Sequence, residues 1–328
     1  HPQDKQKPLK DFKIIVDAGN GAGGFFVDKV LVPLGADVTG SQFLEPDGSF
    51  PNHIPNPEDK KAMDCIKDAV LKNHADLGII FDADVDRAGA VDKNGREINK
   101  NRLIALMSAI VLEEAPGSII VTDSITSSGL KLFIEDKLGG YHHRFKRGYK
   151  NVINEAIKLN NQGKVCNLAI ETSGHGALKE NYFLDDGAYL ISKILIKMAK
   201  LKLQDNKTID SLLAGLAEPT ESKEFRLNIL TDDFKEYGSQ VISDLTDYAQ
   251  DNPDWQIAPN NYEGIRVSFD KNNGDGWFLL RMSLHDPLLP LNIESDSKGG
   301  VRLIANKLIP FLSKYDKLDT TPLKEFLK

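Results

Sequence analysis

The sequence predicts an α/β protein: two repeated α/β three-layer domains with mixed sheets, followed by a smaller α+β domain with an antiparallel sheet. The first observation is an internal repeat of strand, small-residue turn and helix. The second is an apolar run that ends in three alternating acids, Asp82, Asp84 and Asp86. The third is a change to period-two hydrophobicity in the last third of the chain, which is typical of half-buried strands.

The repeat relates residues 13–24 to residues 118–129. Each segment has an apolar strand that leads into a turn of small residues, and a helical stretch follows. Later in each copy an apolar strand ends in an acid, at residues 77–82 and 168–171. This order is typical of βαβ units in a parallel sheet, where ligands bind outside the carboxyl ends of the strands. We therefore expect both acids to lie at ligand sites.

The last third has a different pattern. Phe225, Leu227 and Ile229 alternate as in a half-buried strand, and helical spacing follows. Residues 264–269 and 277–281 are expected strands joined by a turn-rich interval, which favours an antiparallel hairpin. The expected domains are residues 1–101, 102–218 and 219–328.

Composition narrows the possible partners. The 328 residues include 41 Lys and Arg against 48 Asp and Glu, a net charge of −7. This balance argues against a general nucleic-acid or anionic-membrane surface, but permits a local basic pocket for a small phosphorylated ligand.

Cys65 and Cys166 fit reduced thiols in a cytoplasmic protein. The polar run from His1 to Pro8 resembles a linker that has been cut, so we expect a further segment upstream.

The acidic motif predicts a metal site. Asp82, Asp84 and Asp86 directly follow an apolar run, and their charges would repel one another without compensation. Ligation by oxygen alone favours Mg²⁺. A calcium loop of the EF-hand type needs Gly at its sixth position and Glu at its twelfth, where this chain has Arg87 and Lys93. A solvated acidic turn is the alternative.

A second polar group follows the other repeated strand. Glu171, Ser173 and His175 supply an acid, a hydroxyl and an imidazole within five residues, a combination that can bind the hydroxyls of a sugar. A Ser/His hydrolase is disfavoured, because no Gly-x-Ser-x-Gly turn surrounds Ser173.

Two further segments have the composition of phosphate sites. Residues 144–150 form a basic cluster around a glycine, which suits phosphate binding or a solvated basic face equally well. Arg281, Ser283 and His285 occupy alternating positions and could direct three donors at one phosphate, or form a polar turn at the edge of a sheet. The four prolines of residues 46–57 exclude a regular element there, and we favour structural bracing over a role in a cleft.

Taken in order, these segments resemble the α-D-phosphohexomutases, the phosphoglucomutase and phosphomannomutase superfamily. The matching motifs are Val16-Asp-Ala-Gly-Asn-Gly-Ala-Gly23, Phe50-Pro-Asn-His53, Asp82-x-Asp84-x-Asp86-Arg87, Glu171-x-Ser173-Gly-His175 and Arg281-x-Ser283. The resemblance covers almost the whole chain, as the family's second, third and fourth domains. It implies an isomerase of carbohydrate metabolism that interconverts hexose 1-phosphate and 6-phosphate, of glucose or mannose, through a phosphoserine and a hexose 1,6-bisphosphate.

The resemblance also implies roles for individual residues. The three aspartates would hold Mg²⁺ together with the phosphoserine, and Glu171 and Ser173 would bind sugar hydroxyls. Lys146 is the leading candidate for proton transfer and His175 the competitor, and both His175 and Arg87 would lie near the reacting phosphate. The phosphate that is not transferred would be held by Arg281, Ser283 and His285.

Two departures from the family pattern keep alternatives open. The Thr-Ala-Ser-His-Asn type motif of the phosphoserine is not found, so we expect this serine on an absent N-terminal domain and expect the chain alone to be inactive. The phosphate loop has Leu284, His285 and Asp286 in its middle and Pro290 in place of a later Arg.

Two rival functions remain. One is a non-catalytic sugar-phosphate-binding or regulatory remnant, and the other is a metal phosphatase that uses Asp82 as nucleophile. Loops of this type occur in bacteria and plants, so a plastid is an alternative location in a plant.

Overall fold

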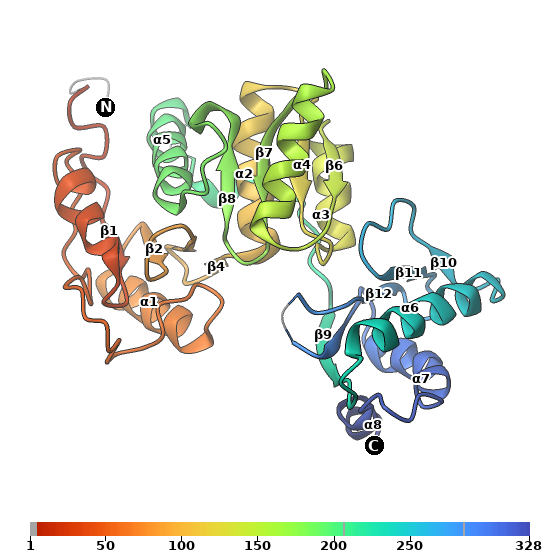
Figure 1. The fold of residues 1–328 in the computed structure, drawn as a ribbon. Coiled ribbons are helices and arrows are strands. Elements are labelled where there is room, and N and C mark those ends of the chain that lie inside the picture. Colours follow the sequence, from red (N-terminus) through yellow and green to blue (C-terminus); the bar gives the residue numbers. More distant parts are fainter. Residues whose placement is uncertain (1–4, 206, 285) are drawn as a thin grey trace. The chain divides into compact units, whose positions relative to one another are not determined.

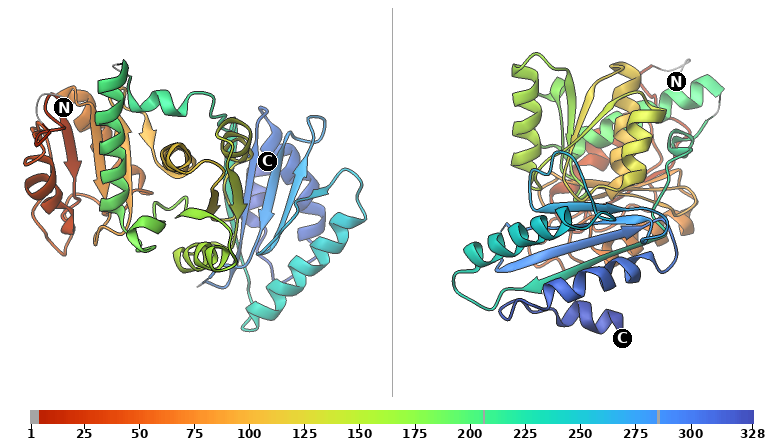
Figure 2. Two further views of the ribbon diagram at one scale, coloured as in Figure 1. Left: turned by 90° about the horizontal axis from the view of Figure 1, so that it is seen from above. Right: turned by 90° about the vertical axis from the view of Figure 1, so that its right-hand side faces the viewer.

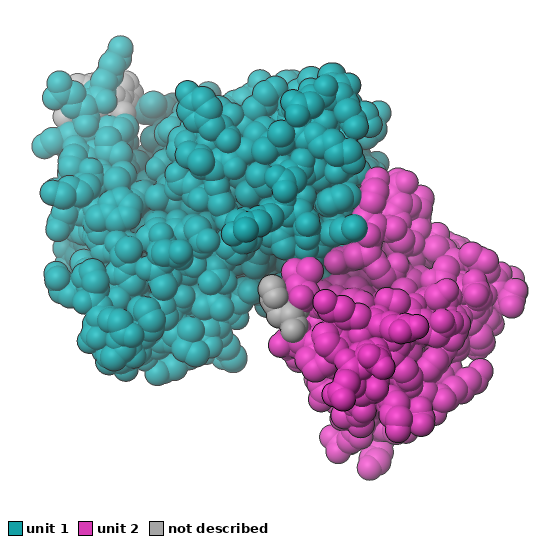
Figure 3. All heavy atoms as spheres, in the orientation of Figure 1, with its two compact units in different colours: residues 1–126, 130–216 teal, residues 127–129, 217–328 magenta. Residues whose placement is uncertain are grey.

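The computed structural model describes residues 5–205, 207–284 and 286–328. Figure 1 shows the fold and Figure 2 gives two further views of it. Contacts along the chain define two compact units, which Figure 3 colours separately. Unit 1 comprises residues 1–126 and 130–216, and unit 2 comprises residues 127–129 and 217–328.

Unit 1 contains two sheets of the same design. In the first, the strand order is β1-β2-β3-β4, with β1 parallel to β2 and the other pairs antiparallel. In the second, the order is β6-β5-β7-β8, with β5 parallel to both neighbours and β8 antiparallel to β7. The strands are β1 Ile14–Asp17, β2 Leu77–Phe81, β3 Ala88–Asp92, β4 Glu97–Ile98, β5 Ile119–Thr122, β6 Tyr141–Arg144, β7 Cys166–Ile170 and β8 Gly176–Leu178.

Helices cover both faces of these sheets. Helix α1 packs its apolar side on one face of the first sheet, and α4 packs on one face of the second. Every residue of α2 from Arg102 to Leu112 is buried, and all of them except Arg102 and Ser108 are apolar, as expected of a helix inside a core. The main helices of unit 1 are α1 Lys60–Asn73, α2 Lys100–Glu114, α4 Tyr149–Asn161 and α5 Gly187–Asp205.

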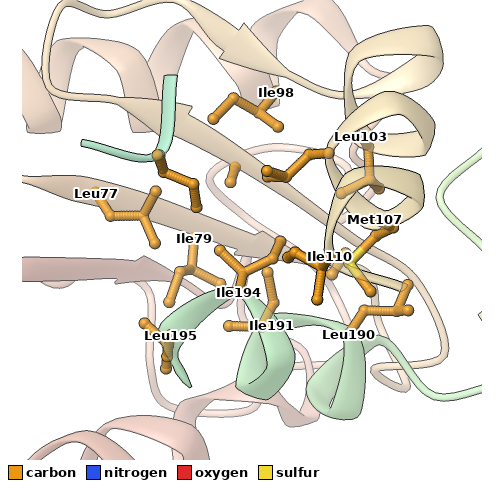
Figure 4. Close-up of a cluster of buried hydrophobic side chains, with 14 of the residues drawn as sticks. Leu77, Ile79, Ile98, Leu103, Met107, Ile110, Leu190, Ile191, Ile194 and Leu195 are labelled. Carbon is orange, nitrogen blue, oxygen red and sulfur yellow. The ribbon is translucent and has the colours of Figure 1, made fainter. Parts of the chain in front are cut away.

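One hydrophobic core joins the two sheets of unit 1. Side chains of β2, α2 and α5 meet in it, among them Leu77, Met107 and Ile194 (Figure 4). Because the strand residues alternate between faces, Ile79 belongs to this shared core while Ile80 packs with α1. The shared core explains why the two repeats form one compact unit.

Unit 2 has a five-stranded antiparallel sheet of order β10-β11-β12-β13-β9. Phe225 and Leu227 of β9 are buried while their neighbours are exposed, which confirms the alternation seen in the sequence. The elements are β9 Glu221–Asn228, α6 Phe234–Gln250, β10 Gln256–Ile257, β11 Ile265–Phe269, β12 Gly276–Leu280, β13 Leu288–Ser295, α7 Gly300–Leu312 and α8 Thr321–Leu327. Strands β11 and β12 form the expected hairpin.

The predicted fold class is confirmed: two α/β repeats with mixed sheets precede an antiparallel α+β region. The helical stretches after the small-residue turns are irregular. The first consists of η1 Ala22–Gly24 and η2 Val27–Leu31, and the second of α3 Ser128–Leu132 and η3 Phe133–Lys137. The boundaries at residues 101 and 218 stay a prediction, and α2 runs through the first of them.

Within the part of the chain that the structure describes, every helix is too short or too polar to cross a membrane.

Candidate active site

The aspartates lie in a tight loop, residues 82–87, between β2 and β3. All five residues of β2 are buried, and the loop closes where Asp82 N donates to Arg87 O over 3.3 Å. Val85, at the loop's centre, has φ +72° and a buried side chain in the unit 1 core. A β-branched residue rarely adopts this conformation, so its burial holds the loop in a strained shape.

The glycine-rich turn after β1, residues 19–24, packs directly against this loop. Ala22 N donates to Ala83 O over 2.8 Å. A Cβ on Gly21 would lie 2.7 Å from Ala83 O and 2.9 Å from Ala83 Cα. Only glycine fits such a close approach of two backbones. The first small-residue turn therefore positions the aspartate loop.

The three carboxylates converge. Among the described residues, Asp82, Asp84 and Asp86 each offer an oxygen, and these atoms all lie within 4.8 Å of one another. Asp82 is buried and accepts from Arg87 N over 3.1 Å and from Arg87 Nε over 2.9 Å. Asp86 Oδ1 is buried without a hydrogen-bond partner, 3.8 Å from Arg87 Nε.

These carboxylates fit a hard cation. Burial and the close approach of Asp86 raise the pKa of Asp82, although the Arg87 backbone N–H and guanidinium act in the opposite direction. A divalent cation would relieve the repulsion and satisfy the orphaned oxygen of Asp86. Asp84 is exposed at the rim of the cluster, where it remains open to a ligand.

The second loop, residues 171–175, connects β7 to β8. It is closed by Glu171 N, which donates to His175 O over 2.9 Å. The Glu171 side chain is 2 % exposed and accepts from Gly148 N over 2.6 Å and from Ser173 Oγ over 3.4 Å. Thr172 Oγ1 donates to the fully buried Asp123, at the end of β5, over 2.6 Å.

The environment of Glu171 favours its neutral form. Burial, followed by the charge of Asp123, raises its pKa to about 7, while the Gly148 N–H, Arg147 and His175 act in the opposite direction. Near neutral pH this carboxyl can therefore accept hydrogen bonds as a carboxylate or donate one as an acid.

The two loops touch. Arg87 and His175 form an antiparallel β-bridge, and His175 Nδ1 lies 3.6 Å from Asp86 Oδ2. Gly187 N, at the start of α5, donates to Val85 O over 3.0 Å. The predicted metal residues and the predicted sugar-binding residues thus form one constellation in unit 1.

His175 is held from two sides. Its Nδ1 lies 2.7 Å from Asp185 Oδ2, and its ring stacks on Tyr149 with centroids 5.0 Å apart. Burial alone would lower the pKa of His175, but the hydrogen bond to Asp185 and the charges of Asp185, Asp86 and Glu171 outweigh it and raise the pKa.

Lys146 is exposed in the segment between β6 and α4. The backbone of this segment reaches the second loop through Gly148, and Arg147 Nη2 lies 3.7 Å from Oε1 of Glu58, which directly follows the proline-rich segment. The basic cluster therefore contacts the constellation through the backbone of Gly148 and the ring of Tyr149, while the Lys146 side chain is exposed.

The proline-rich segment is tied to the end of β1 by a buried pair. His53 Nε2 lies 3.0 Å from Asp17 Oδ1, and both side chains are fully buried. His53 Nδ1 lies 2.9 Å from Ile54 O. Each ring nitrogen faces an acceptor, an arrangement that favours the imidazolium, and the hydrogen bond to Asp17 raises the pKa of His53 against the effect of burial. This contact agrees with a bracing role.

In unit 2 the predicted phosphate residues follow β12. The Arg281 side chain is buried and donates from Nη1 to Met282 O over 3.2 Å. Ser283 Oγ accepts from Asp286 N over 3.2 Å, and Asp286 Oδ2 accepts from Arg226 Nη2 over 3.1 Å. His285 lies outside the described residues.

Sequence reasoning missed Asp123 and Asp185, which hold the second loop and His175. Asp123 carried a signal, because it ends the strand that repeats the one ending in Asp17. Asp185 carried none, because Asp185-Asp186-Gly187 has the sequence of an ordinary helix start.

Comparisons with known proteins agree with this architecture. Residues 2–95 match the profile of the phosphoglucomutase/phosphomannomutase alpha/beta/alpha domain II, and residues 99–219 match that of domain III. A phosphomannomutase/phosphoglucomutase of Pseudomonas putida is 31 % identical over 300 residues, which are 91 % of this chain and 60 % of the relative. A phosphoglucomutase of Neisseria gonorrhoeae is 33 % identical over 304 residues, 92 % of this chain and 61 % of the relative.

A solved structure gives the same result. The phosphoglucomutase/phosphomannomutase family protein of Burkholderia thailandensis has a TM-score of 0.75 and 27 % identity, over 96 % of this chain and 65 % of its own. The chain belongs to the phosphoglucomutase/phosphomannomutase family. It spans 60 % and 61 % of the length of the two curated relatives.

Proposed function

We propose that the protein carrying this chain is a Mg²⁺-dependent phosphohexomutase that interconverts the 1-phosphate and 6-phosphate of glucose or mannose. The observation that carries the proposal is the contact between the loops that follow β2 and β7. One supplies three carboxylates for a cation and the other supplies Glu171, Ser173 and His175 for a sugar. Family membership adds the reaction class, since the relatives are phosphoglucomutases and phosphomannomutases.

The residues of this chain have different roles in the proposed reaction. Asp82, Asp84 and Asp86 would hold Mg²⁺, which neutralises negative charge on the reacting phosphate when bound. Glu171 and Ser173 orient the sugar through its hydroxyls.

His175 accepts or returns the proton of the attacking hydroxyl. The family resemblance favours Lys146 for this role, but its side chain is exposed, whereas His175 contacts the aspartate loop. Because Nδ1 is engaged by Asp185, Nε2 is the atom that can exchange this proton. Arg87 keeps Asp82 oriented and lies next to His175.

Two parts of the proposal lie outside unit 1. Arg281, Ser283 and His285 would hold the phosphate that is not transferred, in the hexose phosphate and in the 1,6-bisphosphate intermediate. The phosphoserine that donates and recovers the phosphoryl group would come from a domain outside these 328 residues.

The test compares Asp84→Asn with the unchanged full-length protein. Isomer formation and free inorganic phosphate are followed together, with and without Mg²⁺. We expect isomerisation to fall by about a hundredfold or more, since the main electrostatic contribution to phosphoryl transfer would be lost. Asp64→Asn, which removes an exposed pair with Lys60 on α1, is the control and should retain activity.

The outcomes separate the alternatives. Near-normal turnover by Asp84→Asn would overturn the metal assignment. Binding of sugar phosphate by the unchanged protein without isomerisation would identify a non-catalytic binder, which the altered loop at Leu284, Asp286 and Pro290 favours. Steady release of inorganic phosphate would identify a phosphatase.

A further inference from the structure

The turn that leads into α5 joins the two active-site loops. Asp185 binds His175 through one carboxylate oxygen, at 2.7 Å from Nδ1. Its other oxygen accepts from Gly176 N over 3.0 Å. One oxygen thus binds His175 and the other binds Gly176, the first residue of β8. With both oxygens bound, the Asp185 side chain has little freedom to rotate.

Gly187, two residues later, fixes the same turn to the aspartate loop. Its N–H donates to Val85 O over 3.0 Å. A Cβ at this position would lie 2.7 Å from Arg87 C and 2.8 Å from Arg87 O, so only glycine permits the approach. The turn thus contacts the strained loop of the metal residues on one side and the histidine on the other.

The arrangement also selects one form of the imidazole. A carboxylate can only accept a hydrogen bond, so the Asp185 contact requires the proton on His175 Nδ1. Among the described residues, His175 Nε2 has no hydrogen-bond partner. The nitrogen left without a proton in the neutral ring is the one available to a substrate.

We propose that Asp185 is a positioning residue, which fixes the tautomer and orientation of His175 relative to the aspartate loop through the turn at Gly187. The inference rests on the proposed function, in which His175 exchanges a proton with the substrate hydroxyl. Tyr149 stacks on the ring and limits its tilt, while Asp185 determines which nitrogen is presented. Nothing in the sequence motif around His175 identifies this partner.

The decisive variant is Asp185→Asn. The Asn Oδ1 can keep the bond from Gly176 N, which directs its NH₂ group toward His175 Nδ1. An NH₂ group donates, so Nδ1 must become the acceptor and the proton must move to Nε2. The substitution therefore inverts the tautomer while keeping the shape of the side chain.

The first measurement needs no activity. Long-range ¹H–¹⁵N NMR of histidine-labelled protein, with the ring neutral, should show Nδ1–H for His175 in the unchanged protein and Nε2–H in Asp185→Asn. Asp186→Asn is the matched control. Asp186 accepts from Tyr189 N over 2.9 Å, a cap that Asn also provides, and from Asn181 Nδ2 over 3.1 Å. Neither bond involves His175, so the His175 signals should not move.

The second measurement is kinetic. In the full-length protein, Asp185→Asn should lower kcat by roughly ten- to a hundredfold with little change in KM, because the lost group orients a proton acceptor and binds no substrate. Asp186→Asn should leave both constants unchanged.

An Nε2–H signal in the unchanged protein, or the same tautomer in Asp185→Asn, overturns the positioning role. A normal kcat despite an inverted tautomer also overturns it. A protein that isomerises no sugar phosphate, yet shows the tautomer inversion, refutes the proposed function and leaves the structural assignment of Asp185 standing.

Discussion

The two repeats of unit 1 place different chemistry on the same framework. In both, a parallel strand pair ends in a small-residue turn and an acidic loop, and an antiparallel strand follows the loop. The first loop gathers Asp82, Asp84 and Asp86, whereas the second has the single carboxyl of Glu171 beside the hydroxyl of Ser173. The first arrangement suits a cation, and the second suits neutral hydroxyl groups.

The buried aspartate that ends the leading strand of each repeat shows the same divergence. Asp17 is paired with the imidazole of His53, and Asp123 accepts from the hydroxyl of Thr172. After burial, the charge of Asp123 is the next largest cause of the raised pKa of Glu171. The structural aspartate of the second repeat thus influences the ionisation of the neighbouring loop.

Removing the imidazole is the most severe test of this difference. His53→Ala leaves the buried carboxylate of Asp17 without its cation, and we expect the free energy of unfolding to fall by about 3–5 kcal/mol at mildly acidic pH. Asp17 keeps bonds from Gly19 N and Gln42 Nε2, both at 2.8 Å, which place the loss at the lower end of that range. Chemical denaturation measures the change.

The loss should depend on pH. The hydrogen bond to Asp17 raises the pKa of His53, against the effect of burial, so the folded protein holds this proton more tightly than the unfolded chain. The stabilisation is complete below the ordinary value of 6.5 and is lost as the pH rises through the folded-state pKa. A double-mutant cycle with Asp17→Asn isolates the pair, and additive losses would show that no pair exists.

Much of this framework could be predicted from the sequence. The apolar run before Asp82, the period-two alternation at Phe225 and Leu227, and the repeat itself depend on local patterns that strands require. The rule that ligands bind at carboxyl ends of strands placed the residues after β2 and after β7 at ligand sites. Only the family resemblance assigned them to one active site, and their contact through Arg87 and His175 comes from the structure.

The supporting contacts could not be predicted in this way. Asp185 reaches His175 only because β8 returns beside β7 and the chain then turns into α5. The basic cluster contacts Glu171 through the backbone N–H of Gly148. Every residue except proline has this group, so the residue type does not indicate the contact. Such contacts depend on how the loops fold back, and the spacing of charged residues does not encode that.

A smaller effect is expected from removing the hydroxyl of Thr172, which binds Asp123 in the second repeat as His53 binds Asp17 in the first. Thr172→Val keeps the shape of the side chain and removes the bond from Oγ1 to Asp123 Oδ2. Bonds to charged groups contribute about 1.5–3 kcal/mol, and we expect a loss of that size. Thr172→Ser retains the hydroxyl and is the control. If Thr172→Val keeps full stability while Thr172→Ser loses it, the methyl group and not the hydroxyl holds the second loop.

The smallest expected effect concerns Glu171, whose substitution should stabilise the protein. Its folded-state pKa of about 7 lies above the ordinary 4.5, because of burial and the charge of Asp123. The folded protein therefore binds this proton more tightly than the unfolded chain. The contribution of this proton to stability is complete below pH 4.5 and is lost as the pH rises through about 7, where the buried carboxyl must ionise.

Glu171→Gln removes that cost while Gln Oε1 can still accept from Gly148 N. At about pH 8 the variant should be more stable than the unchanged protein by about 1–2 kcal/mol, and at about pH 4 the two should be equal. Urea denaturation of unit 1 across this range measures the difference, with the exposed Glu45→Gln as the control. A difference that stays constant with pH would mean that folding does not raise the pKa of Glu171. The two repeats would then differ in the identity of their ligands and not in the ionisation of their loops.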